Sequence, residues 1–155
     1  MGRKRTRAWK YIYFCITGLI FLSLSNCATM KNIMEQWEAR EYLLQGHGLL
    51  AQRDYEGALR EYQKVLSMST HRPPEDEALF NLGLIYAHFA NPKKDFGKSL
   101  DFFNKLIKDY PESHLVEQSK IWIEVLQKNE ELNQVIQKLK QVDIEIEERK
   151  REKGK

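Results

Sequence analysis

The sequence is poor in the residue patterns that build catalytic and metal sites. Only two cysteines occur in 155 residues, and the four histidines share no metal-ligand spacing. No serine lies in a nucleophile-elbow context, and the glycine-rich segment at residues 46–48 lacks the lysine of a phosphate-binding loop. The sequence therefore indicates no enzyme, no metal and no cofactor.

Strand-forming patterns are missing as well. No alternation of apolar and polar residues of strand length follows Lys31, and the four prolines fall at predicted loops or helix ends. Apolar residues recur instead at helical spacing. We therefore expect an all-α fold.

The first 26 residues differ in composition from the rest. Five basic side chains precede an apolar run of 14 residues, Tyr11 to Leu24, which is short for a membrane-spanning helix and typical of a signal peptide. The next residues, Ser25-Asn26-Cys27, resemble the lipobox of bacterial lipoproteins, with Asn26 as a departure from its usual small residue. The resemblance implies cleavage after residue 26 and lipidation of Cys27. An uncleaved anchor and an ordinary secretory signal are the alternatives.

Removal of this segment changes the charge of the chain. It leaves 20 basic and 22 acidic residues, a net charge of −2, so a nucleic-acid partner is not expected. With Cys15 removed and Cys27 lipidated, no thiol remains for a disulfide. Ala28 resembles the residue found after the cysteine in lipoproteins sorted to the outer membrane, so we expect a lipid-anchored envelope protein facing the periplasm.

Two later segments, 38–68 and 75–113, share one plan. Each places a glycine, Gly46 or Gly83, inside a predicted helix that is followed by a turn and a second helix with one apolar stripe. A glycine inside a helix costs about 1 kcal/mol relative to alanine. We therefore expect another helix to come close at both glycines.

These segments resemble the tetratricopeptide repeat, a helix-turn-helix unit of about 34 residues. The second matches best, with serine in place of the family's alanine at position 99, and the first departs at Gln45, Leu49 and Val65. The resemblance implies a short superhelix of two repeats and a capping helix. Its repeat-packing residues would be Gly46, Ala58, Tyr62, Gly83, Tyr86, Ser99, Phe103 and Pro111.

A third unit begins but is not completed. Residues 109–123 resemble the repeat junction of envelope lipoproteins of the BamD-like and Tol-Pal-associated types. We predict a repeat domain over residues 38–128. A lipidated linker or helix over 27–37 precedes it, and a charged helix over 129–155 with a disordered end follows.

The C-terminal segment has a seven-residue period. Apolar residues lie at its a and d positions, and Lys138 could pair with Asp143 across a parallel dimer. Two alternatives remain: a capping helix folded onto its own repeats, or a coiled coil with a partner or a second copy. The seam residues are Val125, Leu132, Val135, Leu139, Val142 and Ile146.

In the repeat family, the first helix of each unit lines a concave groove for a partner segment. This resemblance implies a mixed apolar and charged groove suited to an amphipathic peptide or helix. The alternative is that the helix around Ile33 and Trp37, or the C-terminal helix, covers it. By helical phase the groove residues would be Arg40, Leu43, His47, Leu50, Glu77, Phe80, Leu84 and His88.

The expected function is a membrane-anchored scaffold or adaptor in the bacterial cell envelope, which binds protein partners and forms a homodimer if the C-terminal helix pairs with itself. One alternative is an accessory lipoprotein that regulates an envelope two-component sensor kinase. Another is a component of an outer-membrane assembly or secretion machine.

Overall fold

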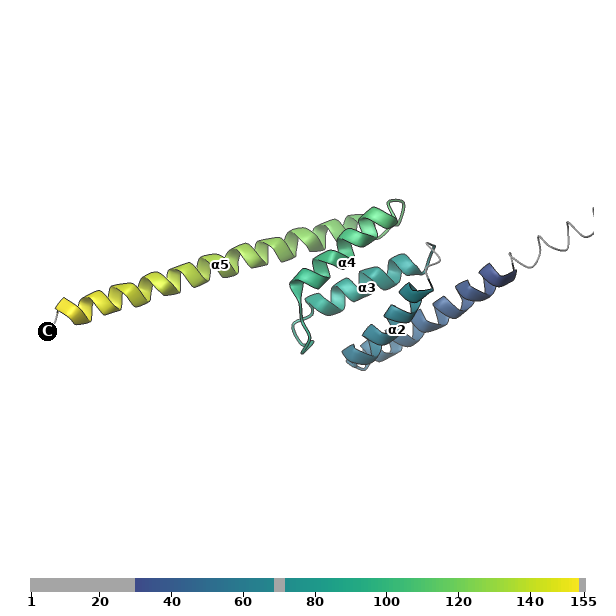
Figure 1. The fold of residues 1–155 in the computed structure, drawn as a ribbon, viewed down its shortest axis with the longest axis horizontal. Helices are drawn as coiled ribbons and strands as arrows, with labels where there is room; N and C mark the ends of the chain where they lie inside the picture. The colour runs from purple at the N-terminus through teal and green to yellow at the C-terminus, as the bar shows by residue number, and fades with distance from the viewer. Residues whose placement is uncertain (1–29, 69–71, 154–155) are drawn as a thin grey trace, which may run out of the picture.

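The protein is all-α in the computed structural model, which describes residues 30–68 and 72–153 (Figure 1). Successive helices fold back on one another, and α3 packs on both α2 and α4, while α4 packs on α5. No strand occurs in these two ranges, and none of their helices is long and apolar enough to cross a membrane. The helices are a first helix over residues 30–51, α2 (Tyr55–Ser67), α3 (Glu75–Ala87), α4 (Phe96–Asp109) and α5 (Val116–Lys153).

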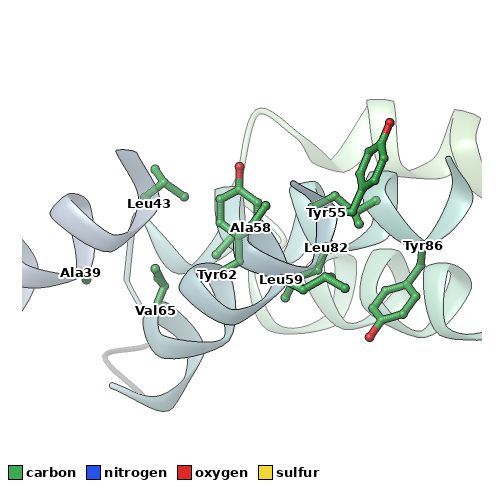
Figure 2. Close-up of a cluster of buried hydrophobic side chains, with 11 residues drawn as sticks. Ala39, Leu43, Tyr55, Ala58, Leu59, Tyr62, Val65, Leu82 and Tyr86 are labelled. Carbon is green, nitrogen blue, oxygen red and sulfur yellow. The ribbon is translucent and has the colours of Figure 1, made fainter. Parts of the chain in front are cut away.

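The first hairpin is held by a cluster of buried apolar side chains (Figure 2). Ala39 and Leu43 of the first helix lie in this cluster together with Tyr62 and Val65 of α2. Gly46 is packed against the Tyr62 ring, because a Cβ built at Gly46 would lie 2.5 Å from Tyr62 Cε1. Only glycine lets the two helices approach this closely.

The second hairpin repeats the arrangement. A Cβ at Gly83 of α3 would lie 2.7 Å from Cε1 and Cζ of Phe103, which is fully buried on α4. The Ser99 hydroxyl donates a hydrogen bond of 2.7 Å to the Gly83 carbonyl, so the serine that replaces the family's alanine is satisfied inside the core. Gly46, Ala58, Gly83 and Ser99 are all buried, which confirms the predicted close packing at these sites.

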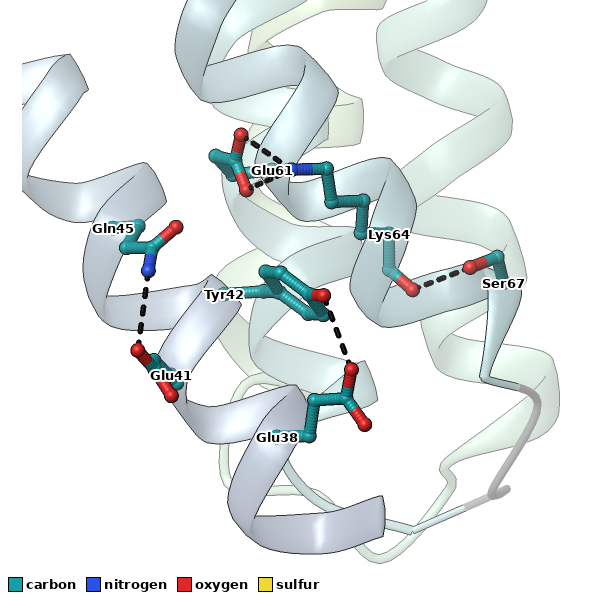
Figure 3. Close-up of polar contacts among 7 residues, drawn as sticks. All are labelled: Glu38, Glu41, Tyr42, Gln45, Glu61, Lys64 and Ser67. Atoms are coloured by element: carbon teal, nitrogen blue, oxygen red, sulfur yellow. Dashed lines mark hydrogen bonds and ion pairs between the residues drawn. The ribbon is translucent and has the colours of Figure 1, made fainter.

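Polar contacts lie within each helix of the first hairpin on another side, where Lys64 of α2 faces the Tyr42 ring of the first helix (Figure 3). Lys64 Nζ lies 4.9 Å from the centre of the Tyr42 ring and also donates to both oxygens of Glu61 at 2.8 Å. The Tyr42 hydroxyl donates to Glu38 Oε1 at 3.1 Å, and this carboxylate raises the pKa of Tyr42. The Lys64–Glu61 pair is partly exposed, with side chains 49% and 13% exposed, and such pairs contribute little, so we assign the stability of the hairpin to the buried cluster.

One predicted packing residue does not pack. Pro111, expected among the repeat-packing residues as the proline that closes the second helix of this repeat, is exposed, and the buried side chain at this junction is Tyr110, 8% exposed. Proline has no backbone N–H and cannot continue a helix, so Pro111 serves to end α4 at Asp109. The junction is fixed instead by Ser113, whose hydroxyl donates to Asp76 Oδ2 of α3 at 2.6 Å.

The turn between α3 and α4 is built around a buried asparagine. Asn91 is 3% exposed; its Nδ2 donates to the Ile85 carbonyl at 2.9 Å and its Oδ1 accepts from the Lys93 N–H at 2.9 Å. Asp95 then caps α4 by accepting from the Lys98 N–H at 3.0 Å, as its helix-start signal predicts. The extra residues of this repeat are therefore ordered by their own hydrogen bonds.

The first helix ends at a residue with unusual backbone geometry. Arg53 has φ 62°, in the left-handed region, although it is not glycine. The Asp54 N–H donates to the Leu49 carbonyl at 2.9 Å and the Arg53 N–H to the Leu50 carbonyl at 2.9 Å, which is the Schellman pattern of helix termination. Arg53 occupies the position where this pattern favours glycine.

Replacing Arg53 with glycine should therefore stabilise the domain. The left-handed conformation costs a residue with a Cβ about 1 kcal/mol or more, and glycine adopts it without that cost. After the larger backbone entropy of glycine in the unfolded chain is subtracted, we expect a gain of about 0.5 kcal/mol. Thermal denaturation of Arg53→Gly and Arg53→Ala should place the glycine variant higher; equal melting temperatures would contradict the strain.

α5 has two parts with different surroundings. Val116, Ser119 and Leu126 are buried in its first turns, whereas every residue from Gln127 to Glu152 is exposed. The capping alternative thus holds only as far as Leu126, and the rest projects away from the repeats (Figure 1). The buried residues run from Ala39 to Leu126, close to the predicted domain of 38–128.

The end of the chain also differs from expectation. The final residues were expected to be disordered, but α5 remains helical to Lys153, with Arg151 Nη2 3.4 Å from Glu147 Oε2 one turn earlier. Alternating charges four residues apart stabilise a helix, which explains the difference. Residues 1–29, including Cys27 and the predicted signal peptide, lie outside the described residues.

Candidate protein-interaction surface

The first helix and α3 are the first helices of the two repeats, and polar side chains connect them. His47 Nε2 lies 3.3 Å from Asn81 Nδ2 and 3.6 Å from Glu77 Oε1. The Asn81 amide also donates to the Glu77 carbonyl at 2.8 Å, which fixes its orientation on α3. We call the surface formed by His47, Leu50, Glu77, Phe80, Asn81 and Leu84 the shared face.

Aromatic rings form the floor of the shared face. His47 meets the edge of Tyr62 with ring centres 5.7 Å apart, and Phe80 meets the edge of Phe103 at 5.6 Å. Burial raises the pKa of the Tyr62 phenol, and the nearby Glu77 carboxylate raises it further. Tyr62 therefore stays neutral at physiological pH and contributes an uncharged floor.

The shared face is half-exposed and offers both apolar and charged groups. Leu50, Phe80 and Leu84 are each partly exposed, and the side chains of His47 and Glu77 are 37% and 45% exposed. Leucine and phenylalanine supply apolar contact area, while Glu77 can accept a hydrogen bond or pair with a cation. Such a surface suits non-covalent binding of an amphipathic segment.

Leu43 does not belong to this surface, contrary to the groove assignment. It is 4% exposed and lies in the buried cluster with Ala39, because the two residues are one helical turn apart on the side of the first helix that packs on α2. Helical phase alone did not show that α2 covers the Leu43 side chain.

Arg40 and His88 lie outside the shared face. Arg40 is exposed, and no contact of its side chain with the shared face occurs within the described ranges. His88 follows the end of α3, where its ring lies 5.2 Å from Tyr55 and 4.8 Å from Phe89. Both residues are exposed, and neither is counted in the shared face.

The proposed cover is absent from the shared face. Ile33 and Trp37 are 46% and 71% exposed, so the start of the first helix does not fold onto the repeats. α5 is also solvent-exposed after Leu126. The start of the first helix and residues 127–152 of α5 therefore do not cover the shared face, whereas the first turns of α5 pack on the domain and bring Trp122 beside Phe103.

Sequence reasoning missed two residues of this region. Asn81 links the two repeats, and its spacing of four residues from Glu77 places both on one side of α3. Trp122 of α5 is 37% exposed and stacks near Phe103, with ring centres 6.4 Å apart and planes at 9°. It extends the aromatic floor to the third helix that begins a repeat.

The side chains at the shared face do not suggest a catalytic site. In the part of the chain that the structure describes, no three His, Cys, Asp or Glu side chains lie together as a metal ion would require. The groups at the shared face are aromatic rings, aliphatic chains and hydrogen-bonding side chains, which act in recognition.

Comparison with known families agrees with this geometry. Residues 77–113 match the family model of the tetratricopeptide repeat, which covers α3, α4 and the junction after them. No curated protein and no solved structure matches the chain. The chain thus contains a tetratricopeptide repeat in an all-helical protein with paired helices and a long C-terminal helix.

Proposed function

We propose that this tetratricopeptide-repeat chain is a lipid-anchored scaffold of the bacterial cell envelope. Proteins with this repeat typically bind other proteins, and the shared face is the observation that carries the proposal here. It joins the first helices of both hairpins through His47, Asn81 and Glu77 and leaves Phe80 and Leu84 partly exposed. A partner segment with apolar residues on one side could bind there.

The anchor in this proposal is Cys27. Its support is the basic front, the apolar run and the lipobox-like residues before the cysteine. Several acyl chains on one residue would hold the protein stably at a membrane. Attachment confines partners to a thin layer, so contacts that are weak in solution become effective.

Replacing Cys27 with alanine should release the protein from membranes. We expect the wild-type protein in the membrane fraction and most of the Cys27→Ala variant in the soluble fraction after cell breakage. Cys15→Ala is the matched control, because this cysteine lies inside the predicted signal peptide and should not carry lipid. Retention of Cys27→Ala in membranes would contradict the lipid anchor.

A photocrosslinking amino acid tests the shared face directly. Placed at Leu50 or at Leu84, it should capture the same partner in native envelopes, because the two residues belong to different repeats of one surface. At Asn104, exposed on α4, it should capture none. Different species at residues 50 and 84, or an equal yield at 104, would contradict a shared binding surface.

We further propose that α5 pairs with a second copy in parallel. Its seam residues are exposed by 45–63%, and Ile121, 60% exposed, continues the d positions toward the domain. Lys138 and Asp143 occupy g and e positions five residues apart, as Glu145 and Lys150 do, so each pair can form across a parallel dimer. None of these four side chains forms an ion pair within the described chain.

Attachment at one membrane favours the parallel arrangement. Both copies would present their domains at the same surface, so their α5 helices would leave it in the same direction. Lys128 lies at a d position, where a polar residue lowers stability and fixes register. It pairs with Glu131 of its own helix at 2.8 Å, which reduces the cost of placing it on the seam.

A further inference from the structure

The start of the first helix exposes an apolar stripe that the repeat domain does not use. Met30, Ile33, Met34 and Trp37 are 65%, 46%, 67% and 71% exposed. They recur at i, i+3, i+4 and i+7, the spacing of one helix face. The residues between them are polar: Lys31, Asn32, Glu35 and Gln36.

This stripe lies opposite the side of the helix that is packed in the core. At 3.6 residues per turn, its centre is roughly 160° from that of Ala39, Leu43 and Gly46, which face α2. The domain therefore cannot cover the stripe without detaching the first helix from α2. Four large apolar side chains, tryptophan among them, are left bare on one face.

The position of the stripe in the chain indicates what covers it. Met30 is three residues after Cys27, and three extended residues span at most roughly 11 Å. Trp37 is seven residues further, about 10 Å along the helix. If Cys27 carries lipid, the whole stripe lies within reach of the bilayer surface.

We propose that the stripe lies in the membrane interface beside Cys27, with the first two turns of the helix parallel to the bilayer. This inference rests on the proposed lipid anchor. Amphipathic helices bind in this way, and tryptophan favours the level of the lipid headgroups. The lipid holds the protein at the membrane, while the stripe sets which side of the domain faces outward.

The charges of the segment that carries the stripe indicate which kind of lipid surface it would bind. Residues 30–41 contain two basic and three acidic side chains, so they have no net attraction to anionic lipid. The contact must then come from apolar burial. We expect it to form on zwitterionic phosphatidylcholine and to be unchanged by added phosphatidylglycerol.

Fluorescence of Trp37 tests the contact in the full lipidated chain. In a variant with Trp9→Phe and Trp122→Phe, Trp37 is the sole indole. After reconstitution into phosphatidylcholine vesicles, lipid that carries a nitroxide on its acyl chain should lower Trp37 emission at least two-fold. The matched protein with Trp9→Phe and Trp37→Phe keeps only Trp122, on α5 at the other end of the helix stack, and should lose less than a fifth of its emission.

The outcomes separate this inference from the anchor. Flotation with vesicles while Trp37 remains unquenched would overturn the interfacial contact and leave the anchor intact. Shielding of Trp37 from aqueous acrylamide without quenching by nitroxide lipid would also overturn it, because protein would then cover the stripe. A chain that does not float at all would contradict both, since a lipid-bound stripe would itself retain the protein.

Discussion

Replacing Gly83 with alanine should lower the free energy of unfolding by about 1–3 kcal/mol. The new Cβ would lie 2.7 Å from two carbons of the Phe103 ring, which is fully buried and cannot move aside without displacing α4. For a domain of this size, each kcal/mol lowers the melting temperature by roughly 4–8 °C. Leucine at Gly83 should have a larger effect.

Gly46 and Gly48 provide the matched comparison on one helix. Alanine at Gly46 should destabilise the protein in the same way, because its Cβ would lie 2.5 Å from Tyr62 Cε1. At Gly48 nothing lies within 4 Å of the new Cβ, so the better helix propensity of alanine should stabilise the domain by about 0.5–1 kcal/mol. Thermal denaturation of the three variants would contradict the close packing if all shifted in the same direction.

Replacing Leu139 with glutamate should separate the proposed dimer. The substitution places two like charges at facing a positions of the seam, and we expect the dissociation constant to rise by about 100-fold, equivalent to roughly 2.7 kcal/mol. Gln137→Glu adds the same charge at an outward f position and should leave the dimer intact. Light scattering of the detergent-solubilised full chain measures both; a wild-type monomer at all concentrations would contradict the proposal.

Exchanging the charges of the predicted Lys138–Asp143 pair tests whether the two α5 helices are parallel. Lys138→Glu alone should weaken the dimer, and adding Asp143→Lys should restore it if the helices are parallel, because these g and e positions then face each other. An antiparallel pair would bring g to g and e to e instead. Failure of the double variant to recover would therefore exclude the parallel arrangement.

The hairpins could be predicted because their signals are local. Gly46 and Gly83 interrupt otherwise favourable helices, and the residues they pack on, Tyr62 and Phe103, lie in the next helix of the same unit. Each contact is thus set within a few tens of residues. The repeat-family match over residues 77–113 falls on the unit whose sequence pattern is the more complete.

The partner of α5 could not be predicted, because a capping helix and a coiled coil share one apolar period. Val125 and Leu132 fit either interpretation by sequence, and only the three-dimensional arrangement shows both exposed, by 50% and 63%. Leu43 shows the same limit of sequence-based prediction at a single position. Helical phase gives the direction of a side chain but not how far the neighbouring helix covers it.

The exposed part of α5 has a thermodynamic consequence. Residues 127–152 are all exposed, so their helical structure gains little support from the domain core. Helices in proteins gain most of their stability from tertiary packing, so this segment should melt separately from the body to which it is attached. Its order should then increase with the number of copies available for association, so the surface density of the protein would control how much of this segment is folded.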